Sequence, residues 1–196
     1  IAKEFGLNRK QCEVFYLFGS TWLSRDGTFS ADTLRLYIGG GAGTGKSHVL
    51  RAIKALTECP AVRHLAPPGR LITVAFQGKQ AASVGGTTVH SVCDPTPRSK
   101  KRTGNEDEGL LSSSHDGQKP LPSKKALHWQ GVAVLAVEEV SMVSCDLLRA
   151  LHKAACSVYP DRAGLPFAGL IVVFLGDFNQ LKPVNSHSLV TPLTKL

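Results

Sequence analysis

The octapeptide Gly40-Gly41-Ala42-Gly43-Thr44-Gly45-Lys46-Ser47 has the spacing G-x-x-x-x-G-K-[ST] that is typical of a phosphate-binding loop. Its glycines allow backbone N–H groups to converge on phosphate oxygens. We expect Lys46 to contact the β- and γ-phosphates of a nucleotide, and the Ser47 hydroxyl to ligate Mg²⁺. All eight residues are therefore candidate nucleotide-binding residues, although the spacing alone does not separate a kinase, a GTPase and a motor.

The segments on either side of this loop supply the context that the motif requires. Leu34 to Ile38 is a short apolar run ending in glycines, and residues 46–56 repeat apolar side chains at helical spacing. Further apolar runs occur at residues 71–76, 132–137 and 170–175, and helices are expected over residues 8–23, 80–84 and 144–158. Apolar strands alternating with helices indicate an α/β fold with a mostly parallel sheet covered on both faces.

Acidic and polar residues follow two of these apolar runs. Glu138 and Glu139 come directly after the run at 132–137. Beside a phosphate loop, one such carboxylate holds Mg²⁺ and the other activates the attacking water, so we assign Glu138 to the metal and Glu139 to catalysis. Gln180 follows the run at 170–175 and is expected to sense the γ-phosphate. We count Lys46 and Gln180, with Glu139, as the catalytic residues. Asp177 either takes part in this sensing or caps the turn.

Length, composition and cysteine usage point to one intracellular globular domain. The 196 residues are 42% hydrophobic and 19% charged, which suffices for one ordinary core. No apolar run approaches the roughly 18 residues of a membrane span, so we expect no membrane partner. The five cysteines include no Cys-x-x-Cys pair, which favours a reducing compartment over a disulfide framework.

The formal net charge of +8 is concentrated in the first half of the chain. Residues 1–93 carry a net +6, residues 94–125 a net +2, and residues 126–196 none. This distribution fits a polyanionic partner such as nucleic acid, and it also fits a merely soluble basic surface.

Residues 94–125 interrupt the alternation of strands and helices. They contain four prolines, several serines and charges of both signs, so we expect a largely unstructured insertion. The chain then divides into an N-terminal helix within residues 1–30 and a nucleotide-binding domain over residues 31–196 that carries this insertion.

Five blocks of the chain resemble, in order, the motifs of the petite-integration-frequency (Pif) family of 5′-to-3′ DNA helicases, a branch of superfamily 1 that includes RecD-like motors. The blocks are Leu7 to Gln11, Gly40 to Ser47, parts of Gly78 to Ser91, Glu138 to Val143, and parts of Pro166 to Val184. The resemblance spans about residues 5–185. The two last blocks together are more specific than the phosphate loop alone.

The resemblance implies a P-loop NTPase (RecA-like) three-layer fold that uses ATP and Mg²⁺ to move along single-stranded DNA and unwind duplex. Gln11 would read the adenine edge, and Gln77, Gly78, Thr88 and His90 would lie along the DNA. It further implies a role in DNA repair, recombination and telomere maintenance, in the nucleus or mitochondrion if the source is eukaryotic. We expect the protein to act as a monomer.

Several features depart from the family pattern. Glu138 stands where the family has Asp, Phe76-Gln77 replaces Pro-Thr, and Lys182 replaces a proline. The longer side chain of Glu138 is expected to shift the Mg²⁺ geometry and weaken hydrolysis. The family also has a second RecA-like lobe, which supplies an arginine that completes the ATP site. The present sequence does not contain that lobe. We therefore expect a fragment that is the N-terminal motor lobe.

Two other functions stay open from the sequence. Glu138 and the missing lobe suggest a catalytically impaired nucleic-acid-binding remnant of a helicase or a mobile element. A different P-loop kinase or GTPase is the other alternative, although the spacing of Asp177 and Gln180 argues against it.

Overall fold

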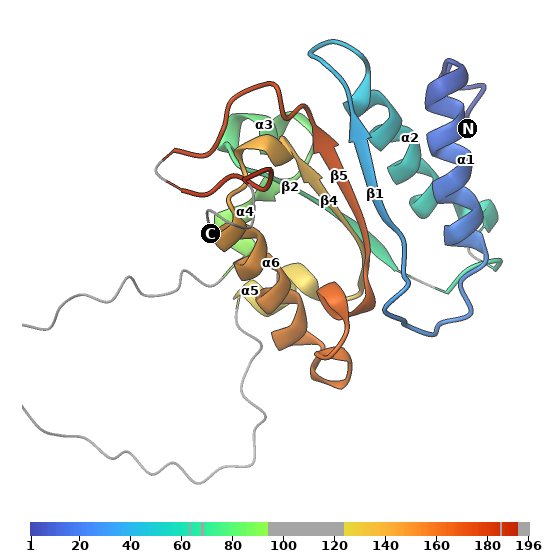
Figure 1. Ribbon diagram of the computed structural model, residues 1–196. Coiled ribbons are helices and arrows are strands. Elements are labelled where there is room, and N and C mark those ends of the chain that lie inside the picture. The colour runs from blue at the N-terminus through green and yellow to red at the C-terminus, as the bar shows by residue number, and fades with distance from the viewer. Residues whose placement is uncertain (63, 68, 94–123, 185, 192–196) are drawn as a thin grey trace, which may run out of the picture.

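The computed structural model describes residues 1–62, 64–67, 69–93, 124–184 and 186–191 (Figure 1). At its centre lies a sheet in the order β1-β5-β4-β2-β3, in which all neighbouring strands are parallel. The strands are β1 (Arg35–Gly39), β2 (Arg70–Ala75), β3 (Thr87–Thr88), β4 (Val132–Glu138) and β5 (Ile171–Gly176). The predicted α/β fold with a parallel sheet is confirmed. The short β3 escapes prediction because its two threonines form no apolar run.

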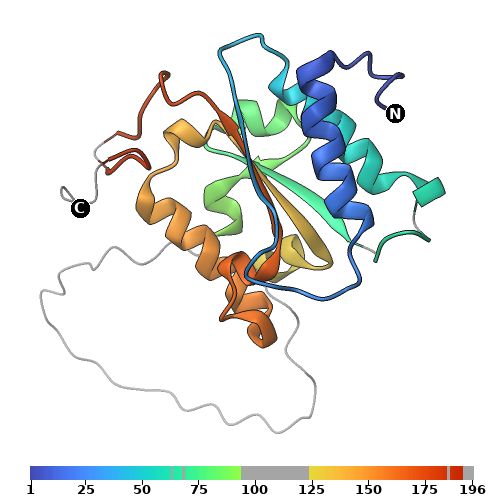
Figure 2. The ribbon, with the colours of Figure 1, turned by 45° about the vertical axis from the view of Figure 1, so that its right-hand side comes forward.

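Helices cover both faces of the sheet, as Figures 1 and 2 show. On one face lie α1 (Arg9–Leu23) and α2 (Lys46–Glu58), and on the other lie α4 (Val89–Val92), α5 (Lys124–Trp129) and α6 (Cys145–Val158). The helix predicted over residues 80–84 is α3 (Gly78–Ser83) and begins two residues earlier. Short 3₁₀ turns are η1 (Pro60–Val62), η2 (Val140–Met142), η3 (Pro160–Arg162) and η4 (Pro166–Gly169).

The two central strands divide their side chains between the two helical layers. In β4, Val134 and Ala136 pack toward α1 and α2, whereas Leu135 and Val137 pack toward α6. Every residue of β4 is buried. A strand buried on both faces reads as a continuous apolar run, which is why the sequence predicts it so clearly.

The predicted insertion at residues 94–125 lies almost wholly outside the described residues. Only its last two residues are described, and α5 begins at the first of them, Lys124, so the stretch ends in a helix instead of continuing as irregular chain. Trp129 closes α5 and is buried, with its indole N–H donating to the carbonyl of Val92 at 3.1 Å. In the described ranges, no helix has the length and apolar character needed to cross a membrane.

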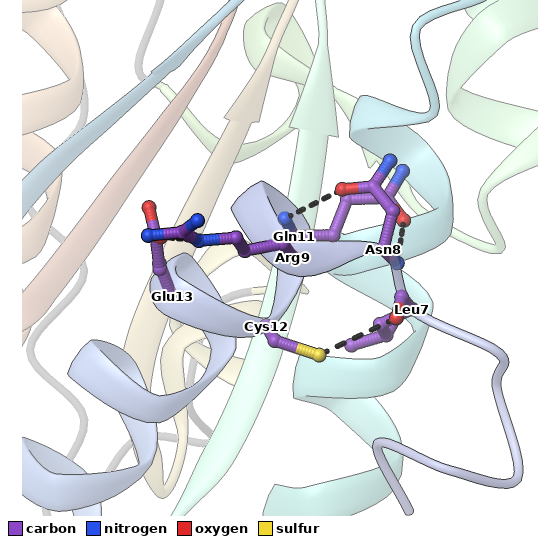
Figure 3. A network of polar contacts seen from close by, with 6 residues as sticks. All are labelled: Leu7, Asn8, Arg9, Gln11, Cys12 and Glu13. Atoms are coloured by element: carbon purple, nitrogen blue, oxygen red, sulfur yellow. Dashed lines mark hydrogen bonds and ion pairs between the residues drawn. The ribbon is translucent and has the colours of Figure 1, made fainter.

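The start of α1 is set by a reciprocal pair of hydrogen bonds (Figure 3). The side chain of Asn8 accepts from the backbone N–H of Gln11, and the side chain of Gln11 accepts from that of Asn8, both at 3.0 Å. Such a capping box satisfies two N–H groups that a helix start otherwise leaves unpaired. From this start, Phe15, Phe18 and Trp22 reach the core shared with α2. The capping box thereby holds Gln11 in the first turn of α1.

Leu135 lies at the centre of β4 and is fully buried. Leu135→Ala removes apolar contacts between β4 and the helical layer that contains α6, and it leaves a cavity. We therefore expect the free energy of unfolding to fall by about 2–5 kcal/mol. Urea unfolding followed by circular dichroism measures this loss. The matched control is Leu181→Ala, whose side chain is 69% exposed and should change stability by less than about 0.5 kcal/mol. Equal effects at the two positions would contradict the assignment of β4 as the core strand.

Candidate functional site

The carboxyl ends of β1, β4 and β5 lie at one edge of the sheet, where the phosphate loop and the polar segments follow them (Figure 1). Gly39 pairs with Gly176 in register. The carbonyl of Gly176 also accepts hydrogen bonds from the N–H of Gly40 at 3.3 Å and from the hydroxyl of Tyr37 at 3.2 Å. These bonds hold the start of the phosphate loop against the end of β5.

The loop itself encloses the ammonium group of Lys46. Its Nζ donates to the carbonyls of Gly40 and Gly41 at 2.6 and 2.8 Å. Gly45 precedes α2 with φ 86°, and a Cβ at that position would lie 2.4 Å from Nε2 of Gln11. The left-handed backbone conformation therefore favours glycine there, whereas the end of the flexible Gln11 side chain could shift to make room.

Gln11 lies beside this loop, although 33 residues separate it from the nearest loop contact. Its Nε2 donates to the carbonyl of Thr44 at 3.4 Å. Both residues line a cavity of about 500 Å³ that also includes Lys10, Val14 and Lys46. The volume is in the range of small-ligand sites. The structure thus brings Gln11 to the phosphate loop, and its contact with adenine stays a prediction.

Glu138 ends β4 and faces the first residues of α2. The Ser47 hydroxyl lies near its carboxylate, and Oε1 of Glu138 is buried with no hydrogen-bond partner among the described residues. Burial raises the pKa of the Glu138 carboxyl, and the interaction with the Ser47 hydroxyl opposes this rise. A buried, unpaired carboxylate oxygen beside a hydroxyl is a donor set that a hard divalent cation fits. The chemistry of these two residues therefore suits the predicted Mg²⁺ site.

Glu139 follows in a strained backbone conformation and points to a different neighbour. Its φ and ψ are 51° and 48°, in the left-handed region, and its carbonyl accepts from the N–H of Met142 at 2.9 Å. Its Oε1 accepts a hydrogen bond from Nε2 of Gln80 in α3. Burial raises the pKa of Glu139, and the Gln80 hydrogen bond and the charge of Lys46 lower it. The two adjacent acids therefore have different partners.

Gln80 is a site residue that the sequence analysis does not identify. It lies in α3 between Lys79 and two alanines, and its side chain is partly buried. Nothing in these neighbouring residues indicates its partner. The partner is 59 residues away in the chain, so only the fold reveals it.

Gln180 is held by its own turn. Its backbone N–H and its Nε2 donate to the carbonyl and to Oδ2 of Asp177, at 2.9 and 3.3 Å. Asp177 also accepts from the N–H of Asn179 at 3.0 Å, so it caps the turn. Within the described residues, the structure places Gln180 at the correct edge, on an exposed turn, and no hydrogen bond joins it to Lys46 or Glu139. Its sensor role stays a prediction.

The four candidate DNA-binding residues lie around α3, β3 and α4. Gln77 precedes α3 and is exposed, and its Nε2 contacts Sδ of Met142 at 3.9 Å. A Cβ built on Gly78 would lie 3.8 Å from the methyl group of Thr88. Thr88 caps α4, and His90 is exposed in the first turn of that helix. The structure therefore brings these residues to one surface, and their contact with DNA stays a prediction.

The burial of Glu138 leads to a test of pH-dependent stability. A carboxyl whose folded pKa is raised makes its full contribution to stability below its unfolded pKa, and this contribution is lost as the pH rises through the folded pKa. Glu138→Gln removes the buried charge, so in EDTA at pH 7 we expect the free energy of unfolding to rise by roughly 1 kcal/mol. The urea midpoints of the variant and the parent, measured from pH 3 to pH 8, should differ least below pH 4.5, the ordinary pKa of the Glu138 carboxyl. A difference that does not depend on pH would exclude this cause.

With the geometry described, the chain can be compared with known proteins. A family model described as PIF1-like helicase matches residues 7–192. The chain is 36% identical over 154 residues to the ATP-dependent DNA helicase PIF7 of Trypanosoma brucei brucei, which covers 78% of this chain and 14% of that protein. It is 30% identical over 161 residues to the human ATP-dependent DNA helicase PIF1, covering 78% of this chain and 20% of that protein. The chain thus matches one fifth or less of the length of either relative.

Solved structures show the same fold. The crystal structure of the Pif1 helicase from Candida albicans matches with a TM-score of 0.61 and 27% identity, over 93% of this chain and 35% of that one. The Pif1 helicase from Bacteroides, in complex with ADP-AlF3 and ssDNA, matches with a TM-score of 0.60 and 24% identity, over 92% of this chain and 34% of that one. The phosphate loop, the acidic pair, this fold and the family match agree, and the chain belongs to the PIF1-like helicase family.

Proposed function

We propose that this chain is the ATP-binding lobe of an ATP-dependent DNA helicase, which binds and hydrolyses ATP to move along single-stranded DNA. The observation that carries the proposal is the meeting of Ser47 and Glu138, from the phosphate loop and the end of β4. Two metal-binding groups beside a phosphate loop are what nucleotide hydrolysis requires. The curated relatives are ATP-dependent DNA helicases, which supports ATP as the nucleotide and DNA as the polymer.

In this proposal the residues around the loop divide the work on the nucleotide. Lys46 exchanges its contacts with the loop carbonyls for contacts with the β- and γ-phosphates. Gln11, held by its capping box, contacts the adenine in the neighbouring cavity. Ser47 and Glu138 hold Mg²⁺, which when bound would neutralise phosphate charge.

Glu139 accepts a proton from the attacking water, and Gln180 contacts the γ-phosphate. Burial supports the role of Glu139, because a carboxylate with a raised pKa is a stronger base. The turn at Asp177 keeps Gln180 at the carboxyl edge of the sheet.

Single-stranded DNA lies on the surface formed by Gln77, Gly78, Thr88 and His90. This surface belongs to the part of the chain with the net charge of +6, which favours a phosphate backbone. The second lobe of the longer protein would supply the arginine and the partner against which this lobe moves. Roles in DNA repair, recombination and telomere maintenance, in the nucleus or mitochondrion, belong to the same proposal.

A catalytically impaired remnant that still binds nucleic acid is a second candidate. The observation that favours it is Glu138, whose side chain is one methylene longer than the Asp expected there. The longer side chain places its carboxylate against Ser47, with one oxygen left unpaired.

Substitution of Lys46 tests the leading proposal. Lys46→Ala removes the only ammonium group held by the loop among the described residues, so we expect Mg·ATP affinity and DNA-stimulated turnover to fall by about tenfold or more. Titration with a fluorescent ATP analogue and steady-state hydrolysis with and without single-stranded DNA measure the two quantities. Arg51→Ala, an exposed cation further along α2, is the matched control. Parent hydrolysis that DNA does not accelerate, or a preference for GTP, would contradict the proposal.

Substitution of the metal-binding acid separates the two candidates. Glu138→Asp shortens the side chain to that of the Asp found in the family. We expect tighter Mg·ATP binding or faster turnover, by roughly three- to tenfold, which corresponds to a gain of about 1 kcal/mol. The dependence of turnover on Mg²⁺ concentration locates the effect at the metal. No change, or a loss, would count against Glu138 as the metal-positioning acid.

A further inference from the structure

Two contacts join the start of α3 to the turn that follows β4. Nε2 of Gln80 donates to Oε1 of Glu139, and Nε2 of Gln77 contacts Sδ of Met142 at 3.9 Å. The two donors are three residues apart, at the residue before α3 and in its first turn, and the two acceptors are three residues apart, before η2 and at its end. The two segments therefore lie side by side over the same number of residues.

The sheet accounts for this arrangement. β2 and β4 are neighbours, and Ala75 pairs with Glu138 in register at their carboxyl ends. The segments that leave these strands, α3 after β2 and η2 after β4, are consequently side by side. Each segment carries one part of the proposed machinery: the candidate DNA contacts Gln77 and Gly78 at the start of α3, and Glu139 before η2.

The Gln80 side chain is held in an arrangement of low net stability. Its amide N–H group is used by Glu139, whereas its Oε1 is buried and has no hydrogen-bond partner among the described residues. A hydrogen bond to a carboxylate is stronger than a neutral one, but the unpaired buried acceptor on the same amide costs a comparable amount. The contact is therefore one that a modest displacement of α3 can break.

The same contact engages the proposed catalytic carboxylate. Oε1 of Glu139 accepts the Gln80 hydrogen bond, so this oxygen is directed toward α3. The backbone of Glu139 is in the left-handed region and its carbonyl is bonded within η2, so the side chain is the part that can turn. Release of Gln80 frees this oxygen to meet the attacking water.

We propose that Gln80 is a positioning residue that restrains Glu139 in the DNA-free lobe, and that single-stranded DNA lying on α3 releases this restraint. The inference rests on the proposed function, since it assigns to that site the route by which DNA accelerates hydrolysis. DNA contacts at Gln77 and Gly78 displace the first turn of α3, and the Gln80–Glu139 hydrogen bond opens. Binding and release are reciprocal, so any change that removes the hydrogen bond also favours the DNA-bound arrangement.

The test compares the parent chain with Gln80→Met and Gln80→Ala. Methionine keeps the length of the side chain and removes the amide, and alanine removes both. Ala82→Gln, which adds an amide at an exposed position of the same helix, is the matched control. Circular dichroism and urea midpoints identify any variant that does not fold, and the methionine variant then carries the test.

Three quantities are measured: the Kd for a fluorescent oligothymidylate, turnover with and without that DNA, and the KM for ATP. For both Gln80 variants we expect DNA-free turnover to rise, the ratio of stimulated to basal turnover to fall toward 1, and the DNA Kd to decrease by about fivefold, the lower end of typical coupling. The KM for ATP should stay within about twofold of the parent, because a positioning role predicts no loss of nucleotide binding. Ala82→Gln should match the parent in all three.

The outcomes separate this inference from the function on which it rests. If the parent shows Lys46-dependent, DNA-stimulated hydrolysis and the Gln80 variants keep its stimulation ratio and DNA Kd, the restraint is overturned and the proposed function stands. If the variants lose basal and stimulated turnover equally, Gln80 supports Glu139 without responding to DNA, and the restraint is again overturned. If the parent neither binds the oligonucleotide nor is stimulated by it, both proposals are overturned.

Discussion

The parallel alignment of β1, β5 and β4 is the constraint on which the site depends. It places three carboxyl ends at one edge, so that the phosphate loop, the acidic pair and the Asp177 turn all follow the sheet on the same side, although long stretches of chain separate them in sequence. The alignment is in turn supported by burial on both faces of the central strands, which are almost entirely apolar. A helical layer on each face removes that apolar surface from water.

The end of β4 is where this apolar interior gives way to charge. Glu138 is the last residue of a strand with no exposed position, and only 6% of its surface is accessible. Its carboxylate is kept there by a hydroxyl and a nearby ammonium group, and one oxygen remains unpaired. The site therefore carries an electrostatic cost in the isolated chain, and a bound cation is the natural compensation.

The position of α1 shows how a local motif acquires a tertiary role. The capping box is encoded within four residues and orders the start of the helix. Packing of Phe15, Phe18 and Trp22 in the core shared with α2 then brings Gln11 to the loop. The same glutamine that closes the capping box also reaches the carbonyl of Thr44 in the phosphate loop.

The sequence by itself determined four of the strands, the helices α1, α2, α3 and α6, the phosphate loop and the acids at the end of β4, because each of these depends on residues that are neighbours in the chain. Apolar runs and fixed motif spacings are local properties, and the residues matching the family blocks are local too. The tertiary structure alone decided that Gln80 contacts Glu139, 59 residues further along the chain. The physical reason lies in strand order: β2 lies beside β4 and β5 lies between β4 and β1, and hydrophobic periodicity carries no information about which strands become neighbours.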